Sequence, residues 1–395
     1  MSELPLETKR INVLEVIGNA IVGGMETYVT RLVEHLPSDR FSVMALCPFE
    51  SHFTDHLRQL DAEVLIAPMP DDPLWSSIQL GCTLVRTRAI DVLHAHLSNA
   101  HLLAGIIGRI TGTPVVATIH GRQLNTIDVE IHRTTGTHLS VVCKHAYFHA
   151  MGLGVHPSQL HCIPNGVDTH RFAPKPDRNA ALRARWGVPA AAPLVGFVGR
   201  LSPEKGPEVF LRVARVMQHL APDAHFVMVG EGPMRSDLLR FVDQYGLKER
   251  VHLVGLHEDM PEVYAELDVL LSTSHTEAMP FALMEAMACG VPVIGTRVGG
   301  VPDLIQHGQT GWLITPGSDQ EAAQRVNALL GSAAERERMG RLARMRCIQG
   351  FSGETSCTAM ASLFSGLVPP ARETQRRIGQ VAPAARLARG KSSPA

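Results

Sequence analysis

The chain has 395 residues, of which 45% are hydrophobic and 19% charged, enough apolar material for two domains with ordinary cores. Its formal net charge of -1 gives no global reason to bind nucleic acid, so any attraction to phosphate has to be local. Seven cysteines without a C-x-x-C pair indicate reduced, buried thiols.

The N-terminal ten residues lack the basic start and apolar run of a signal peptide, and no window holds the eighteen or so apolar residues of a membrane helix. We therefore expect a cytoplasmic protein. Residues 74–88 combine apolar and basic side chains, which is typical of a core-facing helix and less often of a helix lying on a membrane. This segment is the basis for expecting, at most, weak peripheral contact with the inner face of a membrane.

The first 170 residues alternate short apolar runs with segments of helical period. Apolar residues recur at spacings of three and four between residues 25 and 36, which predicts a helix after the first strand. Such β-α-β order is typical of a doubly wound, Rossmann-like domain whose parallel strands are covered on both faces. The predicted strands are INVLEVI, FSVMAL, AEVLIA, DVLHAH, PVVATIH and LSVVC.

The pattern pauses after about residue 165, where Asn-Gly and several prolines predict an interdomain linker, placed at 171–193. It restarts with LVGFVGR, HFVMVG, VHLVGL, DVLLST and PVIGTR, which predict a second Rossmann-like domain over 194–350. A terminal helix is expected at about 351–367, and the Arg-, Pro- and Ala-rich residues 368–395 are expected to be disordered. Strands of both domains should direct their carboxyl ends toward a central cleft.

Two acidic residues seven positions apart, Glu277 and Glu285, stand in the most informative stretch of the chain. Pro280 suits the first turn of a helix ending near Cys289, so Glu285 should lie one turn inside this helix and Glu277 in the loop before it. A carboxylate accepts hydrogen bonds from two neighbouring hydroxyls, and a helix N-terminus favours phosphate. The stretch therefore predicts a sugar-nucleotide site.

Cations and glycines occupy the other expected strand ends. Arg200 and Lys205 follow the first strand of the second domain, where two fixed cations can neutralise a diphosphate. Gly23 and Gly24 stand between the first strand and first helix, where a bare backbone can approach a ligand; no complete G-x-G-x-x-G is present, so a dinucleotide cofactor is not expected.

Histidines gather at two strand ends of the first domain. His120 ends PVVATIH and should project into the cleft, although a lone histidine in an apolar run is often only a packed core residue. His94 and His96 share one strand face and could hold a metal, but no third ligand is evident, so no metal site is expected.

These motifs together resemble the E-x7-E signature of retaining glycosyltransferases of family 4 (glycosyl transferases group 1), which have the GT-B fold. The resemblance runs from about residue 11 to about 367 and includes IPNGVD, GRLSPEKG, VGEGP and GGVPD. It implies two Rossmann-like domains facing a central cleft. It assigns His120, Arg200, Lys205 and Glu277 to catalysis, and it assigns donor binding to Gly23, Gly24, Arg200, Lys205, Gly232, Gly255, Glu277, Ala278, Pro280, Phe281 and Glu285.

The resemblance further implies transfer of a hexose from a nucleotide-diphosphate sugar, most simply a UDP-sugar, to a hydroxyl of a sugar or lipid-linked sugar acceptor. Anomeric configuration would be retained, in polysaccharide or glycolipid assembly. No D-x-D is present, so no metal or other cofactor is expected. Two alternatives remain open: a nucleotide-sugar epimerase or hydrolase on the same fold, and a non-catalytic scaffold that binds nucleotide sugars. Asp303, Ala278 and Gly353 depart from the residues usual in the family.

Overall fold

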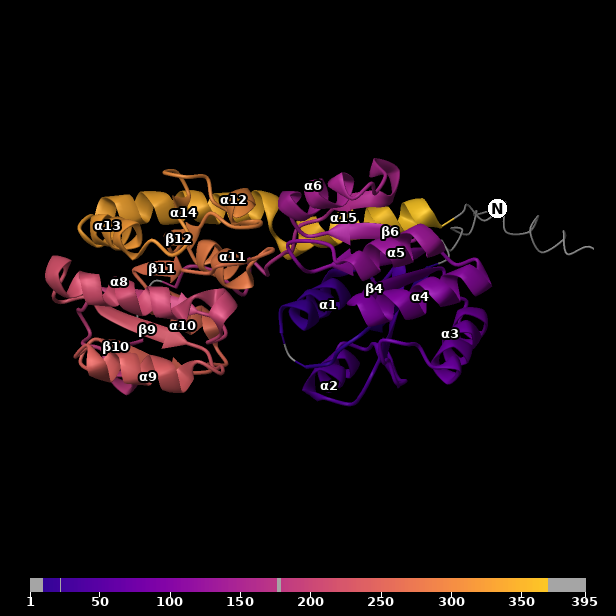
Figure 1. Cartoon of the computed structure of the whole chain (residues 1–395), viewed down its shortest axis with the longest axis horizontal. Coiled ribbons are helices and arrows are strands. Elements are labelled where there is room, and N and C mark those ends of the chain that lie inside the picture. Colours follow the sequence, from indigo (N-terminus) through magenta and orange to yellow (C-terminus); the bar gives the residue numbers. More distant parts are fainter. Residues whose placement is uncertain (1–9, 22, 176–178, 369–395) are drawn as a thin grey trace, which may run out of the picture.

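The computed structural model of the chain describes residues 10–21, 23–175 and 179–368 (Figure 1). Two lobes lie side by side, each built on one parallel sheet with helices on both faces. The predicted pair of Rossmann-like domains is confirmed. The tail expected to be disordered lies outside the described residues, apart from Val368.

The sheet of the first lobe has seven parallel strands in the order β3-β2-β1-β4-β5-β6-β7 among the described residues. One face packs against α3 and α4, and the other packs against α1, α2 and α15. The strands are β1 (Ile11–Ile17), β2 (Phe41–Cys47), β3 (Glu63–Ile66), β4 (Val92–His96), β5 (Val115–Ile119), β6 (His138–Val141) and β7 (Leu160–Cys162). The helices are α1 (Gly24–His35), α2 (His52–Gln59), α3 (Trp75–Thr87), α4 (Ser98–Thr111), α5 (Thr126–Thr135) and α6 (Lys144–Gly152), with a 3-10 turn at Pro157–Gln159.

Within the described ranges, the sheet of the second lobe has six parallel strands in the order β10-β9-β8-β11-β12-β13. Its strands are β8 (Leu194–Val198), β9 (His225–Val229), β10 (Val251–Gly255), β11 (Val269–Ser272), β12 (Val293–Thr296) and β13 (Gly311–Ile314). Its helices are α8 (Pro207–Leu220), α9 (Arg235–Gln244), α10 (Met260–Glu266), α11 (Phe281–Ala288), α12 (Val301–Leu304), α13 (Asp319–Leu330) and α14 (Ala333–Gly350), with a 3-10 turn at Pro203–Lys205 before α8.

The terminal helix α15 (Gly353–Leu367) crosses back to the first lobe and packs on α1, as predicted (Figure 1). It begins at Gly353. A Cβ there would lie 3.1 Å from Nε2 of His35, so a larger residue requires the His35 side chain to shift by a few tenths of an ångström. Gly353 therefore lets the start of α15 approach the His35 side chain of α1 closely.

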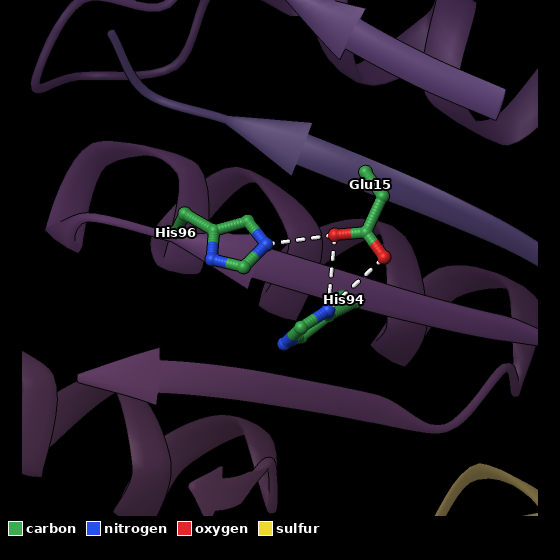
Figure 2. Close-up of side chains that lie close together, drawn as sticks. All are labelled: Glu15, His94 and His96. Atoms are coloured by element: carbon green, nitrogen blue, oxygen red, sulfur yellow. Dashed lines mark hydrogen bonds and ion pairs between the residues drawn. The ribbon is translucent and has the colours of Figure 1, made fainter. Parts of the chain in front are cut away.

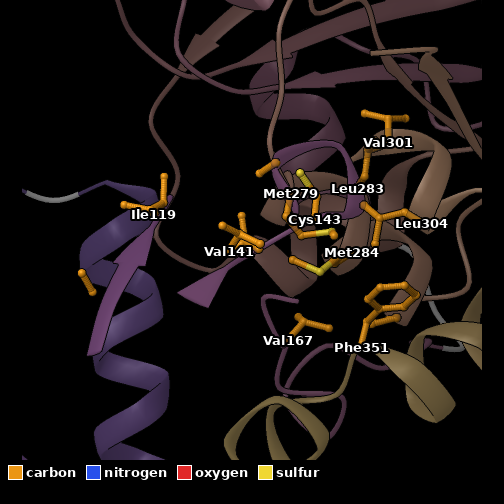
Figure 3. Packing of buried hydrophobic residues seen from close by; sticks show 14 of the residues in the cluster. Ile119, Val141, Cys143, Val167, Met279, Leu283, Met284, Val301, Leu304 and Phe351 are labelled. Carbon is orange, nitrogen blue, oxygen red and sulfur yellow. The ribbon is translucent and has the colours of Figure 1, made fainter. Parts of the chain in front are cut away.

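One apolar cluster is continuous across the two lobes. Val141, Cys143 and Val167 of the first lobe belong to the same buried cluster as Met279 and Met284 of the second (Figure 3). A side-chain hydrogen bond of 3.0 Å, donated by Asn165 to the carbonyl of Met279, crosses the same boundary. Burial of apolar area from both sides fixes the lobes against each other at this end.

Helix α3 has the mixed character expected of residues 74–88. Ile78, Leu84 and Val85 are buried in the core, whereas Trp75 is 66% exposed. In the part of the chain that the structure describes, no helix is long and apolar enough to cross a membrane.

The segment expected as a linker, 171–193, holds a short helix, α7 (Ala180–Trp186), that packs on the second lobe. The Arg183 side chain is 1% exposed, and its Nε lies 2.7 Å from Oε2 of Glu266, which is fully buried. The guanidinium also donates to carbonyls of Ala192 (2.8 Å) and Glu266 (2.7 Å). The buried salt bridge between Arg183 and Glu266 anchors α7 to the second lobe.

Replacing Arg183 with alanine should destabilise the protein by about 3–5 kcal/mol, because it leaves the Glu266 carboxylate buried without its partner. Denaturant unfolding followed by circular dichroism measures the loss. Arg185→Ala is the matched control, since Arg185 belongs to the same helix and is exposed. Equal, small effects of the two substitutions would contradict the structural role of the ion pair.

Candidate active site

The strand order of the second-lobe sheet indicates where the expected site lies. In open parallel sheets, ligands bind at the carboxyl ends of the strands where the order reverses, because the flanking loops diverge to opposite faces. In the second lobe this reversal falls between β8 and β11. Lys205 follows β8 and Glu277 follows β11, so the two loops at this reversal supply these two side chains.

The Lys205 ammonium and the Glu277 carboxylate form an ion pair. Nζ of Lys205 lies 2.7 Å from Oε1 of Glu277, and the Ser274 hydroxyl donates to the same oxygen at 2.8 Å. Glu277 is 8% exposed. Its second oxygen, Oε2, accepts no hydrogen bond from any described residue and is not enclosed, so it is free to accept one from a ligand.

Glu285 has a similar arrangement one turn inside α11. The Tyr264 hydroxyl donates to Oε2 of Glu285 at 2.8 Å, while Oε1 has no partner among the described side chains and is not enclosed. Burial raises the pKa of Glu285 above its ordinary value, although the bond from Tyr264 acts in the opposite direction. Each of the two glutamates is thus anchored through one oxygen and leaves the other available.

Two glycines set the path of the Glu277 loop. At Gly299, where φ is +48°, a Cβ would lie 1.6 Å from the carbonyl oxygen of Glu277. At Gly300 it would lie 2.0 Å from the carbonyl of Ala278. No other residue permits this approach of two backbones. The motif GGVPD therefore supports the loop from beneath, and the Asp303 carboxylate accepts a 2.8 Å bond from the backbone N–H of Lys144 at the start of α6, which ties the motif to the first lobe.

The remaining second-lobe residues of the predicted donor site lie at or after the carboxyl ends of strands β8, β9, β10 and β11. Pro280 is the N-cap of α11, one residue before the helix rather than inside its first turn as expected. Gly232 follows β9, where a Cβ would lie 2.4 Å from the carbonyl of Leu201, and Gly255 ends β10. Arg200 is exposed, and among the described residues no hydrogen bond or salt bridge joins its side chain to the Lys205–Glu277 pair.

The first lobe approaches the site through the N-terminus of α1. Gly23 caps this helix, and a methyl group on Gly24 would lie 3.9 Å from the Phe281 ring at the start of α11. The two helix N-termini therefore face each other across the boundary between the lobes (Figure 1). Unpaired N–H groups at helix N-termini favour anionic ligands.

His120 follows β5 and is partly exposed. Its Nε2 lies 3.0 Å from Nδ1 of His96, and the Tyr28 ring packs against it with centroids 5.0 Å apart. Burial, together with the neighbouring imidazoles of His96 and His94, lowers the pKa of His120 well below its ordinary value. At neutral pH the ring is uncharged.

Glu15 is a residue that the sequence analysis missed. It lies in β1, fully buried between His94 and His96, and Oε2 lies 2.7 Å from Nε2 of His96 (Figure 2). The three side chains are close enough to form a metal-ligand set. Glu15 is thus the third ligand whose apparent lack was the reason for expecting no metal. A charged residue inside the apolar run INVLEVI was the signal that could have revealed it.

Comparison with known proteins agrees with this geometry. Residues 22–171 match the model of Glycosyltransferase Family 4, and residues 179–346 match that of Glycosyl transferases group 1. A GDP-mannose-dependent phosphatidylinositol monomannoside mannosyltransferase of Mycolicibacterium smegmatis is 30% identical over 67% of this chain and 73% of its own length.

The chain belongs to glycosyltransferase family 4. A further relative, the UDP-Gal:α-D-GlcNAc-diphosphoundecaprenol α-1,3-galactosyltransferase of Escherichia coli, is 28% identical over 74% of this chain and 81% of its own. Among solved structures, Anabaena HepE in complex with UDP is similar with a TM-score of 0.80 and 24% identity, covering 91% of this chain and all of its own. This structural likeness confirms the GT-B fold. The family models and the named relatives show that this chain is a hexosyltransferase.

Replacing Glu285 with glutamine should stabilise the free glycosyltransferase at neutral pH. The fold raises the pKa of this carboxyl, so the wild type loses stability as pH rises from the ordinary value of 4.5 through the raised one, whereas glutamine does not titrate. The free energy of unfolding of the variant should exceed that of the wild type by about 1.4 kcal/mol for each unit by which the fold raises the pKa. This difference should vanish below the ordinary pKa of the carboxyl. Thermal unfolding of both proteins across pH 4 to 8 checks this; an advantage that grew toward acid would contradict it.

Proposed function

We propose that this glycosyltransferase transfers a sugar from a UDP-sugar to a hydroxyl of a lipid-linked or free sugar acceptor, with retention of anomeric configuration. The observation that carries the proposal is the shared design of Glu277 and Glu285. Each is held through one oxygen by a protein donor and leaves the other oxygen available. Two such acceptors on one loop and helix suit two sets of hydroxyl groups, a ribose and a hexose.

In this proposal, the second lobe binds the donor. Glu285 accepts hydrogen bonds from the ribose hydroxyls, and Glu277 accepts them from the hexose. Lys205 neutralises the diphosphate with Arg200, and the charge of Lys205 matters most as the nucleotide diphosphate departs. The ion pair between Lys205 and Glu277 keeps the ammonium beside the carboxylate that orients the sugar.

The first lobe would bind the acceptor. Its α1 and α2 border a cavity of about 330 Å³ lined by hydroxyl, imidazole, guanidinium and carboxylate groups, among them Thr27, His52, Arg171 and Glu34. Such a lining offers hydrogen-bond donors and acceptors to a polar, hydroxyl-rich molecule. The mannosyltransferase and galactosyltransferase relatives are named for phosphatidylinositol and diphosphoundecaprenol acceptors, which supports a lipid-linked acceptor in polysaccharide or glycolipid assembly.

A panel of nucleotide diphosphates tests the donor. A ligand that binds only the folded state raises the unfolding temperature in proportion to its binding free energy. UDP and UDP-sugars should raise it more than GDP, ADP or their sugars. Donor turnover that proceeds equally with and without an acceptor would instead favour the epimerase or hydrolase alternative, and donor binding with no turnover would favour the scaffold.

Lys205→Ala should lower kcat for sugar transfer by about 10²- to 10³-fold, as expected when one preorganised charge opposite a leaving group is removed. Glu285→Ala should weaken binding of UDP by roughly tenfold to a hundredfold, through loss of hydrogen bonds to a charged acceptor. Lys248→Ala is the control, because Lys248 is an exposed lysine paired with Asp243 at the end of α9. Wild-type activity in both site variants would refute the assignment.

Transfer should also persist after dialysis against EDTA. The cationic side chains and helix N-termini would compensate the charge of the diphosphate, a task that a divalent ion performs in transferases with a D-x-D motif. Activity measured with and without added Mg²⁺ or Mn²⁺ checks this. Loss of transfer in EDTA with recovery on adding metal would contradict it.

A further inference from the structure

A chain of buried polar side chains leads from the core of the first lobe to His120. The Glu15 carboxylate lies between two imidazoles, 2.9 Å from Nδ1 of His94 and 2.7 Å from Nε2 of His96. The other nitrogen of His96, Nδ1, lies 3.0 Å from Nε2 of His120. Glu15, His94 and His96 are 0% exposed (Figure 2). Water therefore does not compete for the bonds among Glu15, His94 and His96.

The chemistry of each group fixes where the protons lie. An ionised carboxylate can only accept hydrogen bonds, so Nε2 of His96 carries the proton that it donates to Glu15. A neutral imidazole has one N–H, which makes Nδ1 of His96 an acceptor. Nε2 of His120 must then be the donor of the 3.0 Å bond. The pKa values agree with this order, because histidine contacts hold that of Glu15 below its ordinary value and burial lowers that of His96 to about 4.

We infer that Glu15 and His96 are positioning residues, which hold His120 as the Nε2–H tautomer and leave its Nδ1 as a hydrogen-bond acceptor for a hydroxyl in the cleft. Nδ1 of His120 has no hydrogen-bond partner among the described residues and is not enclosed by them. A positioned acceptor of this kind can orient a hydroxyl group of the donor sugar or of the acceptor. The role of Nδ1 of His120 in sugar transfer rests on the proposed function, whereas the assignment of the tautomer is independent of it.

A metal site is the competing interpretation of the same three side chains. The distances of 2.7 to 2.9 Å from the carboxylate to the imidazoles are those of hydrogen bonds, and both remaining ring nitrogens have partners, Thr118 for His94 and His120 for His96. The rings of Tyr28 and Phe364 pack against His94 at 6.3 and 5.2 Å between centroids. A continuous hydrogen-bonded chain with apolar cover is the better description.

The tautomer of His120 can be read directly by NMR. Histidine rings labelled with ¹⁵N give multiple-bond ¹H–¹⁵N correlations that distinguish a protonated ring nitrogen from a bare one, and His120→Gln identifies the signal. We expect a protonated Nε2 in the wild type. Glu15→Gln should shift His120 toward a mixture of tautomers, because an amide can donate as well as accept and no longer orders the protons of His96.

Thr118→Val is the matched control. It removes the 2.7 Å partner of His94 and so disturbs the buried chain at the opposite end, but it leaves the Glu15–His96–His120 sequence intact. Its His120 signals should match the wild type. In transfer assays, Glu15→Gln should lower kcat by about tenfold or more, while UDP binding, which belongs to the second lobe, stays unchanged.

Three results would overturn the inference: a wild-type His120 protonated at Nδ1, no change of tautomer in Glu15→Gln, or a stoichiometric metal ion found by elemental analysis of the purified protein. The wild-type spectrum alone decides if Glu15→Gln does not fold. A wild type that binds no nucleotide sugar and transfers none would defeat the proposed function, whereas the NMR result would still settle the tautomer.

Discussion

The reversal of strand order between β8 and β11 is the constraint on which the site depends. Successive helices leave these adjacent strands toward opposite faces of the sheet, so their loops diverge, and open sheets bind ligands at such a point. Lys205 comes from one loop and Glu277 from the other, and their 2.7 Å ion pair spans the gap. Backbone packing of Gly299 and Gly300 beneath the Glu277 loop fixes one side of it, so the carboxylate has a defined position before any ligand arrives.

Much of this arrangement could be predicted from the sequence, because it depends on local patterns. Short apolar runs predicted the strands except β7 and β13, which end the two sheets and were missed. The turn before α11 placed Glu277 outside the helix and Glu285 inside it. Contacts made at long range could not be predicted in the same way. Glu15 meets His94 only because β1 and β4, far apart in the chain, pair in a register that sets these two residues opposite each other. Helix α7 was missed because its main anchor, the buried Arg183, is of a residue type normally expected at the surface.

Glu15 and Glu285 differ in how completely the protein supplies their hydrogen-bond partners. Glu15 is fully enclosed yet has its pKa lowered, since two histidines compensate for the loss of water, while Glu285 keeps an oxygen for a ligand and has its pKa raised by burial. A carboxylate with all its partners inside the protein serves structure or positioning. One whose hydrogen bonds are left incomplete is ready to bind, at some expense to the stability of the free protein.

Helix α15 supplies Met360 and Phe364 to the apolar layer beneath β1, β4 and β5, and Phe364 covers the ring of His94. The last helix of the described chain is therefore part of the first lobe. During synthesis on the ribosome, the first lobe emerges before this helix exists, so the ring of His94 lacks its Phe364 neighbour until the second lobe has been translated. The first lobe is thus complete only when α15, which is translated after the second lobe, has packed on α1.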